Sequence, residues 1–246
     1  MITLTSLSKI YRTDEIETVA LENVNLTVDR GEFLSIMGPS GCGKSTLLNI
    51  MGLLDAPTTG TVEINGTHTE GMKDKQLAAF RNKTLGFVFQ SFHLINSLNV
   101  MDNVELPLLY RRIGSGERKR LAKEVLEKVG LSHRMNHFPT QLSGGQCQRV
   151  AIARALLSEA RITFFDEALS ALDALHQNTV LRYLKEAKPQ ESLWFFVSHD
   201  LEAVVTLCDR VIVLGEGGIL ADGNPESLLR SGNAALRTLI KRCYWE

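Results

Sequence analysis

The stretch GPSGCGKST, residues 38–46, places three glycines, a lysine and three hydroxyl side chains close together. Gly38, Gly43, Lys44 and Ser45 match G-x-x-x-x-G-K-[ST], a pattern in which consecutive backbone N–H groups turn toward one bound anion. The lysine of this pattern reaches the β- and γ-phosphates of a nucleotide, and the serine hydroxyl binds Mg²⁺. The segment therefore predicts a nucleoside triphosphate site formed by Gly38, Pro39, Ser40, Gly41, Cys42, Gly43, Lys44, Ser45 and Thr46.

A second stretch, RITFFDE, ends in two adjacent carboxylates. Asp166 closes an apolar strand pattern and is expected to hold Mg²⁺, directly or through water. Glu167 is expected to orient and polarise an attacking water as a general base. An acidic pair in isolation more often does no more than end a strand. Together with a phosphate-binding loop, the pair predicts hydrolysis.

A third stretch, LSGGQ, stands directly before a long helical pattern. Its hydroxyl group and bare backbone N–H groups at a helix N-terminus form another anion-binding surface. The chain thus has two phosphate-binding surfaces and one lysine-containing phosphate loop, which favours a nucleotide shared between two copies. The residues of this second surface are Ser143, Gly144, Gly145 and Gln146.

The elements that must position these residues are visible in the apolar pattern. Residues 33–37 read as a buried strand, and a helical pattern begins at Lys44, which is the context that the phosphate loop requires. Three more apolar strands are expected within 161–166, 193–200 and 209–223, and strands that alternate with helices predict a mostly parallel sheet. We expect one domain, residues 1–246, in which 1–90 and 161–246 form the nucleotide-binding core and 91–160 form a helical subdomain with the LSGGQ segment.

The bulk properties exclude several function classes. Lys plus Arg number 27 and Asp plus Glu number 28, so a net charge of −1 gives no reason to expect nucleic acid or an anionic membrane surface as partner. No apolar run approaches the roughly 20 residues that span a bilayer, and the N-terminus has no long apolar segment of a secretory signal. The four cysteines are far apart, which favours a reducing cytosol without disulfides or a zinc site.

With LSGGQ beside a phosphate loop, the sequence resembles the ATP-binding subunits of ABC transporters over nearly its whole length. The resemblance implies an α/β fold: a P-loop NTPase (RecA-like) parallel sheet core, an N-terminal antiparallel β subdomain and an inserted α-helical subdomain. It also implies that Tyr11 stacks on adenine, that Gln90 is the Q-loop glutamine at the metal, and that Asp173 is the D-loop aspartate. His199 matches the switch histidine that contacts the γ-phosphate and acts in catalysis with Glu167.

Within that family the sequence is most like the lipoprotein-release and macrolide-efflux type (LolD and MacB), judged from residues 11–28, 33–60 and 87–110. Ala168 and Leu169 follow the glutamate where that type usually has proline and a small polar residue. The segment DEALSALD and residues 195–204 are closer to subunits of peptide or metal importers. The transported substrate and the direction of transport therefore stay open.

The resemblance also implies partners. Two copies of the chain would close on ATP and Mg²⁺ as a homodimer, and separate integral membrane permease subunits would contact residues 91–107. The chain would be cytoplasmic, peripheral on the cytoplasmic face of the inner membrane, and would touch the membrane only through the permease. The alternative is a soluble ABC-type ATPase with a non-transport partner, although the chain shows neither the long coiled coil nor the second ATPase domain that such proteins usually have.

The C-terminal residues are the least typical part of the sequence. Leu236, Leu239 and Ile240 have the spacing of an apolar helix face. A short helix that packs on the sheet domain and a helix that docks on a partner subunit both fit this pattern.

Overall fold

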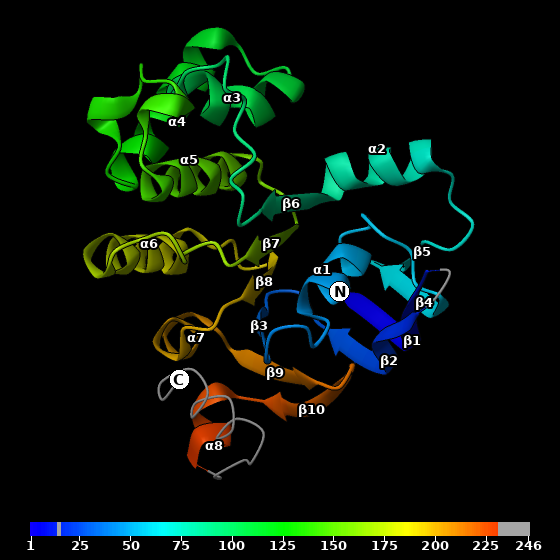
Figure 1. Ribbon diagram of the computed structural model, residues 1–246. Helices are drawn as coiled ribbons and strands as arrows, with labels where there is room; N and C mark the ends of the chain where they lie inside the picture. The colour runs from blue at the N-terminus through cyan, green and yellow to red at the C-terminus, as the bar shows by residue number, and fades with distance from the viewer. Residues whose placement is uncertain (14–15, 231–246) are drawn as a thin grey trace.

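The chain folds around two β-sheets, which the computed structural model describes with their helices over residues 1–13 and 16–230 (Figure 1). The larger sheet has the strand order β10-β9-β3-β8-β7-β6. β9, β3, β8, β7 and β6 run parallel to their neighbours, and β10 pairs antiparallel with β9. The bounds are β3 Phe33–Met37, β6 Leu85–Val88, β7 Ile162–Asp166, β8 Leu193–Val197, β9 Arg210–Gly215 and β10 Gly218–Gly223.

The central parallel strands are apolar because they are covered on both faces. Every residue of β3 and of β8 is buried, and the rings of Phe164 and Phe195 stack across β7 and β8 at 4.9 Å. In this register Asp166 lies opposite Val197, so β7 and β8 end side by side. Segments that follow the carboxyl ends of parallel strands meet at one edge of the sheet, which is where ligands of such sheets bind.

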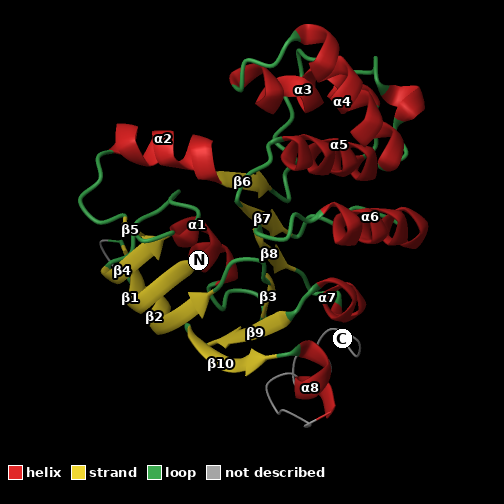
Figure 2. Cartoon of the chain, turned by 180° about the vertical axis from the view of Figure 1, so that it is seen from behind, coloured by secondary structure: helices red, strands yellow, loops and turns green. Residues whose placement is uncertain are grey.

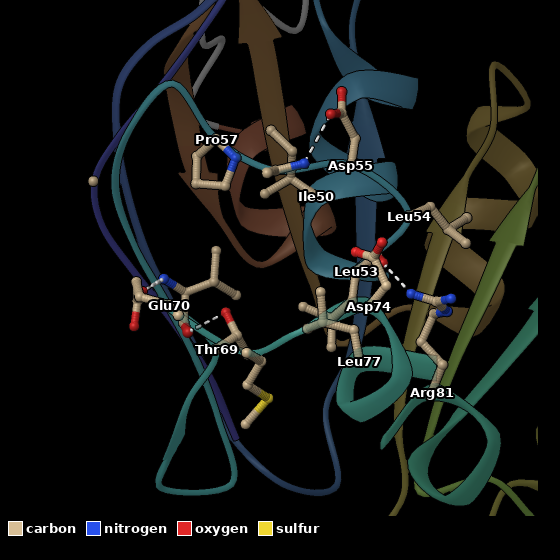
Figure 3. Close-up of a pocket in the computed structure, with 15 residues that line it drawn as sticks. Ile50, Leu53, Leu54, Asp55, Pro57, Thr69, Glu70, Asp74, Leu77 and Arg81 are labelled. Atoms are coloured by element: carbon tan, nitrogen blue, oxygen red, sulfur yellow. Dashed lines mark hydrogen bonds between the residues drawn. The ribbon is translucent and has the colours of Figure 1, made fainter. Parts of the chain in front are cut away.

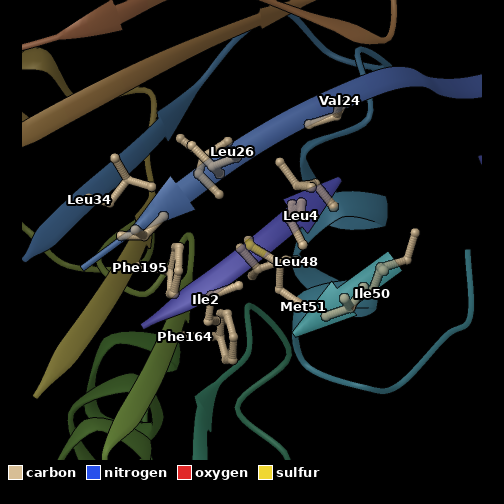
Figure 4. Packing of buried hydrophobic residues seen from close by; sticks show 14 of the residues in the cluster. Ile2, Leu4, Val24, Leu26, Leu34, Leu48, Ile50, Met51, Phe164 and Phe195 are labelled. Carbon is tan, nitrogen blue, oxygen red and sulfur yellow. The ribbon is translucent and has the colours of Figure 1, made fainter. Parts of the chain in front are cut away.

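A second, four-stranded antiparallel sheet has the order β2-β1-β4-β5. One apolar cluster joins it to the larger sheet, with Ile2 and Leu26 on one side and Phe195 on the other (Figure 4). Helix α1 lies within this cluster and contributes Leu48 and Met51. The bounds are β1 Ile2–Arg12, β2 Glu17–Val28, β4 Thr59–Ile64, β5 Thr67–His68 and α1 Lys44–Met51.

Three helices between β6 and β7 form a separate layer around their own apolar core (Figure 2). Val104 and Leu108 of α3, Leu126 of α4 and Val150 of α5 meet in that core. The layer lies within residues 91–160, and those bounds for a subdomain stay a prediction. The helices and short 3₁₀ turns are α2 Asp74–Thr84, α3 Val100–Tyr110, α4 Ser115–Lys128, η1 Ser132–Arg134, η2 Pro139–Gln141, α5 Gly144–Leu157, α6 Ala174–Ala187, α7 Leu201–Leu207 and α8 Pro225–Arg230.

Two features differ from the sequence-based expectation. Residues 209–223, expected as one strand, form the hairpin β9–β10, because Glu216 and Gly217 adopt φ of 51° and 81° and reverse the chain. Helix α2 is absent from the expected elements, since its sequence is mostly polar and leaves only a weak apolar pattern.

Within the described ranges no helix is long and apolar enough to cross a membrane. The expected helix at Leu236, Leu239 and Ile240 lies outside the described residues.

Candidate active site

The phosphate loop connects β3 to α1, and two of its three glycines, Gly41 and Gly43, differ in their surroundings. Gly43 has φ of 98°, and a Cβ there would lie 2.4 Å from the carbonyl oxygen of Ala20, so only glycine fits between the loop and β2. Gly41 has φ of 78°, but a Cβ there would meet nothing within 4 Å. The loop is thus closely packed at its base and open at its tip, where a ligand can approach the backbone.

Lys44 lies inside the loop, with only 8% of its surface exposed. Its ammonium donates to the carbonyl oxygens of Gly38 and Pro39 at 2.8 Å each. A buried positive charge at the N-terminus of α1 favours an anion at that point. The thiol of Cys42 lies 4.0 Å from the same ammonium, yet its burial raises its pKa, so Cys42 behaves as a small neutral side chain.

Three expected site residues come together where β6, β7 and β8 end. The carboxylate of Glu167 lies 3.1 Å from His199 Nε2 and accepts a hydrogen bond from Gln90 Nε2 at 3.4 Å. Glu167 has φ of 47°, a left-handed conformation that costs about 1–3 kcal/mol for a residue with a side chain. Such strain persists where surrounding contacts hold the backbone, and here it directs the carboxylate between Gln90 and His199.

Asp166 stands beside Glu167 with an unusual charge environment. Burial is the main factor that raises its pKa, repulsion from Glu167 adds to the effect, and Lys44 opposes it. A bound cation would relieve this concentration of negative charge. The carboxylate of Asp166 and the exposed hydroxyl of Ser45 are oxygen ligands of the kind that Mg²⁺ prefers, and Mg²⁺ commonly takes only one or two carboxylates plus phosphates. In the described ranges no group of three or more His, Cys, Asp and Glu is placed to hold a metal ion.

The LSGGQ residues lie at the start of α5 and form a capping box. Ser143 Oγ accepts from the Gln146 N–H at 3.3 Å, and Gln146 Oε1 accepts from the Ser143 N–H at 3.0 Å. With Asp173 and His176 they line a cavity of about 410 Å³, in which no described residue of the phosphate loop takes part. Asp173 caps α6, and hydrogen bonds from the backbone and ring of His176 lower its pKa. In one copy of the chain, the two surfaces expected to bind anions therefore do not share this cavity.

Tyr11 is fixed by two residues that sequence reasoning missed. Its side chain is 43% exposed, and its hydroxyl donates to Asp55 at 3.0 Å. Lys9 donates to the same carboxylate at 2.7 Å, and its ammonium lies 4.9 Å from the centre of the Tyr11 ring. Burial alone would raise the pKa of Asp55, but the hydrogen bonds from Lys9, Ala56 and Tyr11 lower it overall. Lys9 lies two positions before Tyr11, and residues two apart share one face of a strand, so the sequence could have indicated that Lys9 contacts Tyr11.

A cavity of about 570 Å³ lies beside α1, the β4–β5 hairpin and α2, and Asp55 is among the residues that line it (Figure 3). Its walls are apolar at Ile50, Leu53 and Leu77, with Asp74 and Arg81 among the charged lining residues. Arg81 donates to the Leu53 carbonyl oxygen at 2.6 Å, so this guanidinium is already bonded within the protein. None of the expected site residues lines this cavity.

The comparisons with known proteins agree with this geometry. Residues 21–170 match the family described as ABC transporter. The uncharacterized ABC transporter ATP-binding protein MJ1508 of Methanocaldococcus jannaschii is 46% identical over 220 residues, which are 89% of this chain and 98% of that protein. The macrolide export ATP-binding/permease protein MacB of Chlorobaculum tepidum is 42% identical over 90% of this chain, which spans 34% of that protein.

Solved structures give the same result for the fold. The ATP-binding cassette MJ0796, in a dimeric post-hydrolysis state bound to ADP and Pi, superposes with a TM-score of 0.86 at 40% identity. The match covers 92% of this chain and 99% of that one. It confirms the expected α/β fold of an ABC ATPase, and with the MacB relatives it confirms the expected resemblance to the LolD and MacB type.

Proposed function

The chain belongs to the family of ABC transporter ATP-binding proteins, and from that premise we propose that it hydrolyses ATP to power transport through separate permease subunits. Members of this family are ATP hydrolases, and the solved relative bound to ADP and Pi is a post-hydrolysis state. The observation that carries the proposal is the carboxylate of Glu167 between Gln90 and His199, next to Asp166, whose charge interacts with Lys44 of the phosphate loop.

In the proposed reaction, the phosphate loop and Lys44 bind the β- and γ-phosphates of ATP. Ser45, Gln90 and Asp166 would hold Mg²⁺, which neutralises charge on those phosphates when bound. Glu167 takes the proton of the attacking water, and His199 Nε2, which lies 3.1 Å from the carboxylate, orients it. The family resemblance assigns a contact with the γ-phosphate to the same imidazole. The exposed ring of Tyr11, held by Asp55 and Lys9, supplies a platform for adenine.

We further propose that each nucleotide lies between two copies of the chain. The separate location of the Ser143–Gln146 surface and the phosphate loop in one copy supports this arrangement. The solved MJ0796 cassette is dimeric, which supports it as well. Ser143, Gly144, Gly145 and Gln146 of one copy, with Asp173 close by, would then complete the ATP site of the other. Loss of the γ-phosphate would remove contacts across the interface and let the copies separate.

A mixing experiment tests the shared site. Chains with Lys44→Ala and chains with Ser143→Arg are each expected to be inactive alone, because every site contains a lesion. In a mixed dimer both lesions fall on one site and the other site is intact, so ATPase activity should return. The measurement is steady-state phosphate release after the two chains are mixed, with differently tagged chains to prove that mixed dimers form. Proven mixed dimers without any recovery would contradict the shared site.

The permease contact is expected at residues 91–107, and we propose that it extends from Pro107 into the space between the helical layer and the larger sheet. A cavity of about 330 Å³ is lined there by residues of α2, β6, α3 and α5, including Pro107, Tyr110, Arg111 and Arg154. Tyr110 is 74% exposed and its neighbour Leu109 is 50% exposed, so both side chains are available to a partner. The MacB relative, an ATP-binding/permease protein that extends well beyond this chain, also supports a permease partner. The chain would work on the cytoplasmic face of the membrane, held there by the permease.

Recovery of the partner tests the transport role. A tagged chain, purified from its own cells in mild detergent, should carry an integral membrane protein with it, and Tyr110→Ala should reduce that recovery. Leu220→Ala is the matched control, because Leu220 is also apolar and 58% exposed but lies on β10. Recovery of a ribosomal, DNA-bound or other non-membrane partner instead would favour the alternative of an ATPase with a non-transport role.

A further inference from the structure

We infer that Gln148 is a positioning residue that holds the backbone of Glu167 and ties it to the start of α5; this rests on the proposed role of Glu167. Gln148 is 0% exposed and lies on α5, two positions after Gln146. Its Nε2 donates to the Glu167 carbonyl oxygen at 3.0 Å. Its Oε1 accepts from the Ala171 N–H at 2.9 Å. One buried amide thus joins α5 to both ends of the turn that follows β7.

The turn needs such support because Glu167 adopts a left-handed conformation, with φ of 47°. A residue with a side chain stays in that conformation only where its neighbours hold it. The Glu167 N–H donates to the Val197 carbonyl oxygen at 3.0 Å, which fixes the peptide unit before Glu167. The Glu167 carbonyl oxygen accepts from the Ser170 hydroxyl at 2.8 Å and from the Ser170 N–H at 3.1 Å, but Ser170 belongs to the same turn and moves with it. Gln148 supplies a donor from outside the turn.

The contact also couples two parts of the site. Helix α5 begins next to Ser143, in the surface proposed to meet the nucleotide of the other copy, and it reaches Gln148 about one turn later. The Ala171 N–H, bonded to the same side chain, lies two positions before Asp173. A shift of α5 would therefore pull on the carbonyl of Glu167 and on the segment that leads to Asp173 at once. In this way closure of the two copies would set the position of the carboxylate.

The first variant is Gln148→Met, which keeps the length of the side chain and removes both hydrogen bonds. Because misplacement of a catalytic group by about 1 Å can lower a rate about 10²-fold, we expect a fall in kcat of about 10- to 100-fold. ATP affinity should not change, since the phosphate loop is not touched. A fall in kcat without a change in KM reports the loss of an interaction that matters only during reaction. An unchanged kcat for folded Gln148→Met would overturn the inference.

Asn25→Leu is the control for the loss of an amide that bonds two backbone groups. Asn25 lies on β2, outside the proposed site, where its Oδ1 accepts from the Ser6 N–H at 2.8 Å and its Nδ2 donates to the Asn23 carbonyl oxygen at 3.0 Å. This variant should keep the kcat of the wild type. If both variants lose kcat to the same extent, the role of Gln148 is structural only and the inference fails.

A second variant, Gln148→Glu, adds a pH profile that a structural role would not move. When ionised, the new carboxylate faces the Glu167 carbonyl oxygen with no proton to donate. When protonated, it can again donate to that oxygen and accept from the Ala171 N–H. The ratio of variant to wild-type kcat should therefore rise as the pH is lowered from about 8.5 toward 6, because burial raises the pKa of a carboxyl group. A ratio that stays flat over this range would overturn the inference.

The outcome for Glu167 separates this inference from the proposed function. If Glu167→Gln keeps wild-type turnover, the proposed chemistry itself is wrong. If Glu167→Gln is inactive while folded Gln148→Met keeps wild-type turnover, the proposed chemistry stands and the positioning role is rejected.

Discussion

Glu167→Gln is expected to lower steady-state ATP hydrolysis by about 10²–10⁴-fold, the usual contribution of a positioned general base, while ATP still binds. The amide has the shape of the carboxylate but cannot accept the proton of the attacking water. It can still occupy the space between Gln90 and His199, so the geometry of the site should survive. Phosphate release measures the turnover, and equilibrium binding of a fluorescent ATP analogue measures the affinity.

The same variant should accumulate as an ATP-bound dimer, because the contacts of the γ-phosphate are no longer removed by hydrolysis. Light scattering should report a doubled mass with ATP and a single chain without it. Glu186→Gln is a suitable control, because Glu186 lies on α6, outside the proposed site, and its turnover should match that of the wild type. Turnover of Glu167→Gln within a few-fold of wild type would exclude Glu167 as the base.

Lys44→Ala is expected to act at an earlier step, the binding of ATP. The ammonium of Lys44 is the buried cation of the phosphate loop, and a hydrogen bond to a charged group contributes about 1.5–3 kcal/mol. Loss of one such bond to phosphate corresponds to an affinity roughly 10- to 150-fold lower, and hydrolysis should fall at least as much. Isothermal titration with ATP measures the affinity directly.

The variant also removes two bonds within the loop, from Lys44 to the carbonyl oxygens of Gly38 and Pro39. A thermal melt without nucleotide must therefore show that the chain is folded before its affinity is interpreted. Lys75→Ala on α2 is the control, because that side chain is exposed and lies outside the phosphate loop. ATP affinity and turnover both equal to wild type would remove Lys44 from the proposed site.

Much of the architecture is readable without coordinates, because it depends on local patterns. A continuous apolar run such as residues 193–197 predicts a strand buried on both faces, and the structure buries every residue of β8. The local sequence of residues 38–46 is sufficient to predict a phosphate loop, since its glycines and lysine suit a turn between a strand and a helix. The hairpin at Glu216 and Gly217 was missed because residues 209–223 carry apolar residues on both sides of a short turn.

The sequence by itself determined the kinds of groups available for chemistry: a phosphate loop, an acidic pair after a strand, and a second helix N-terminus suited to anions. The sequence identified Gln90, Glu167 and His199 as separate candidates, because local sequence patterns do not show which side chains are in contact. Tertiary structure alone decided that their strands end side by side, and that two hydrogen bonds from buried Gln148 reach the turn at Glu167. The physical reason is that such contacts join residues far apart in the chain, whose distance is set by strand order and register rather than by local preference.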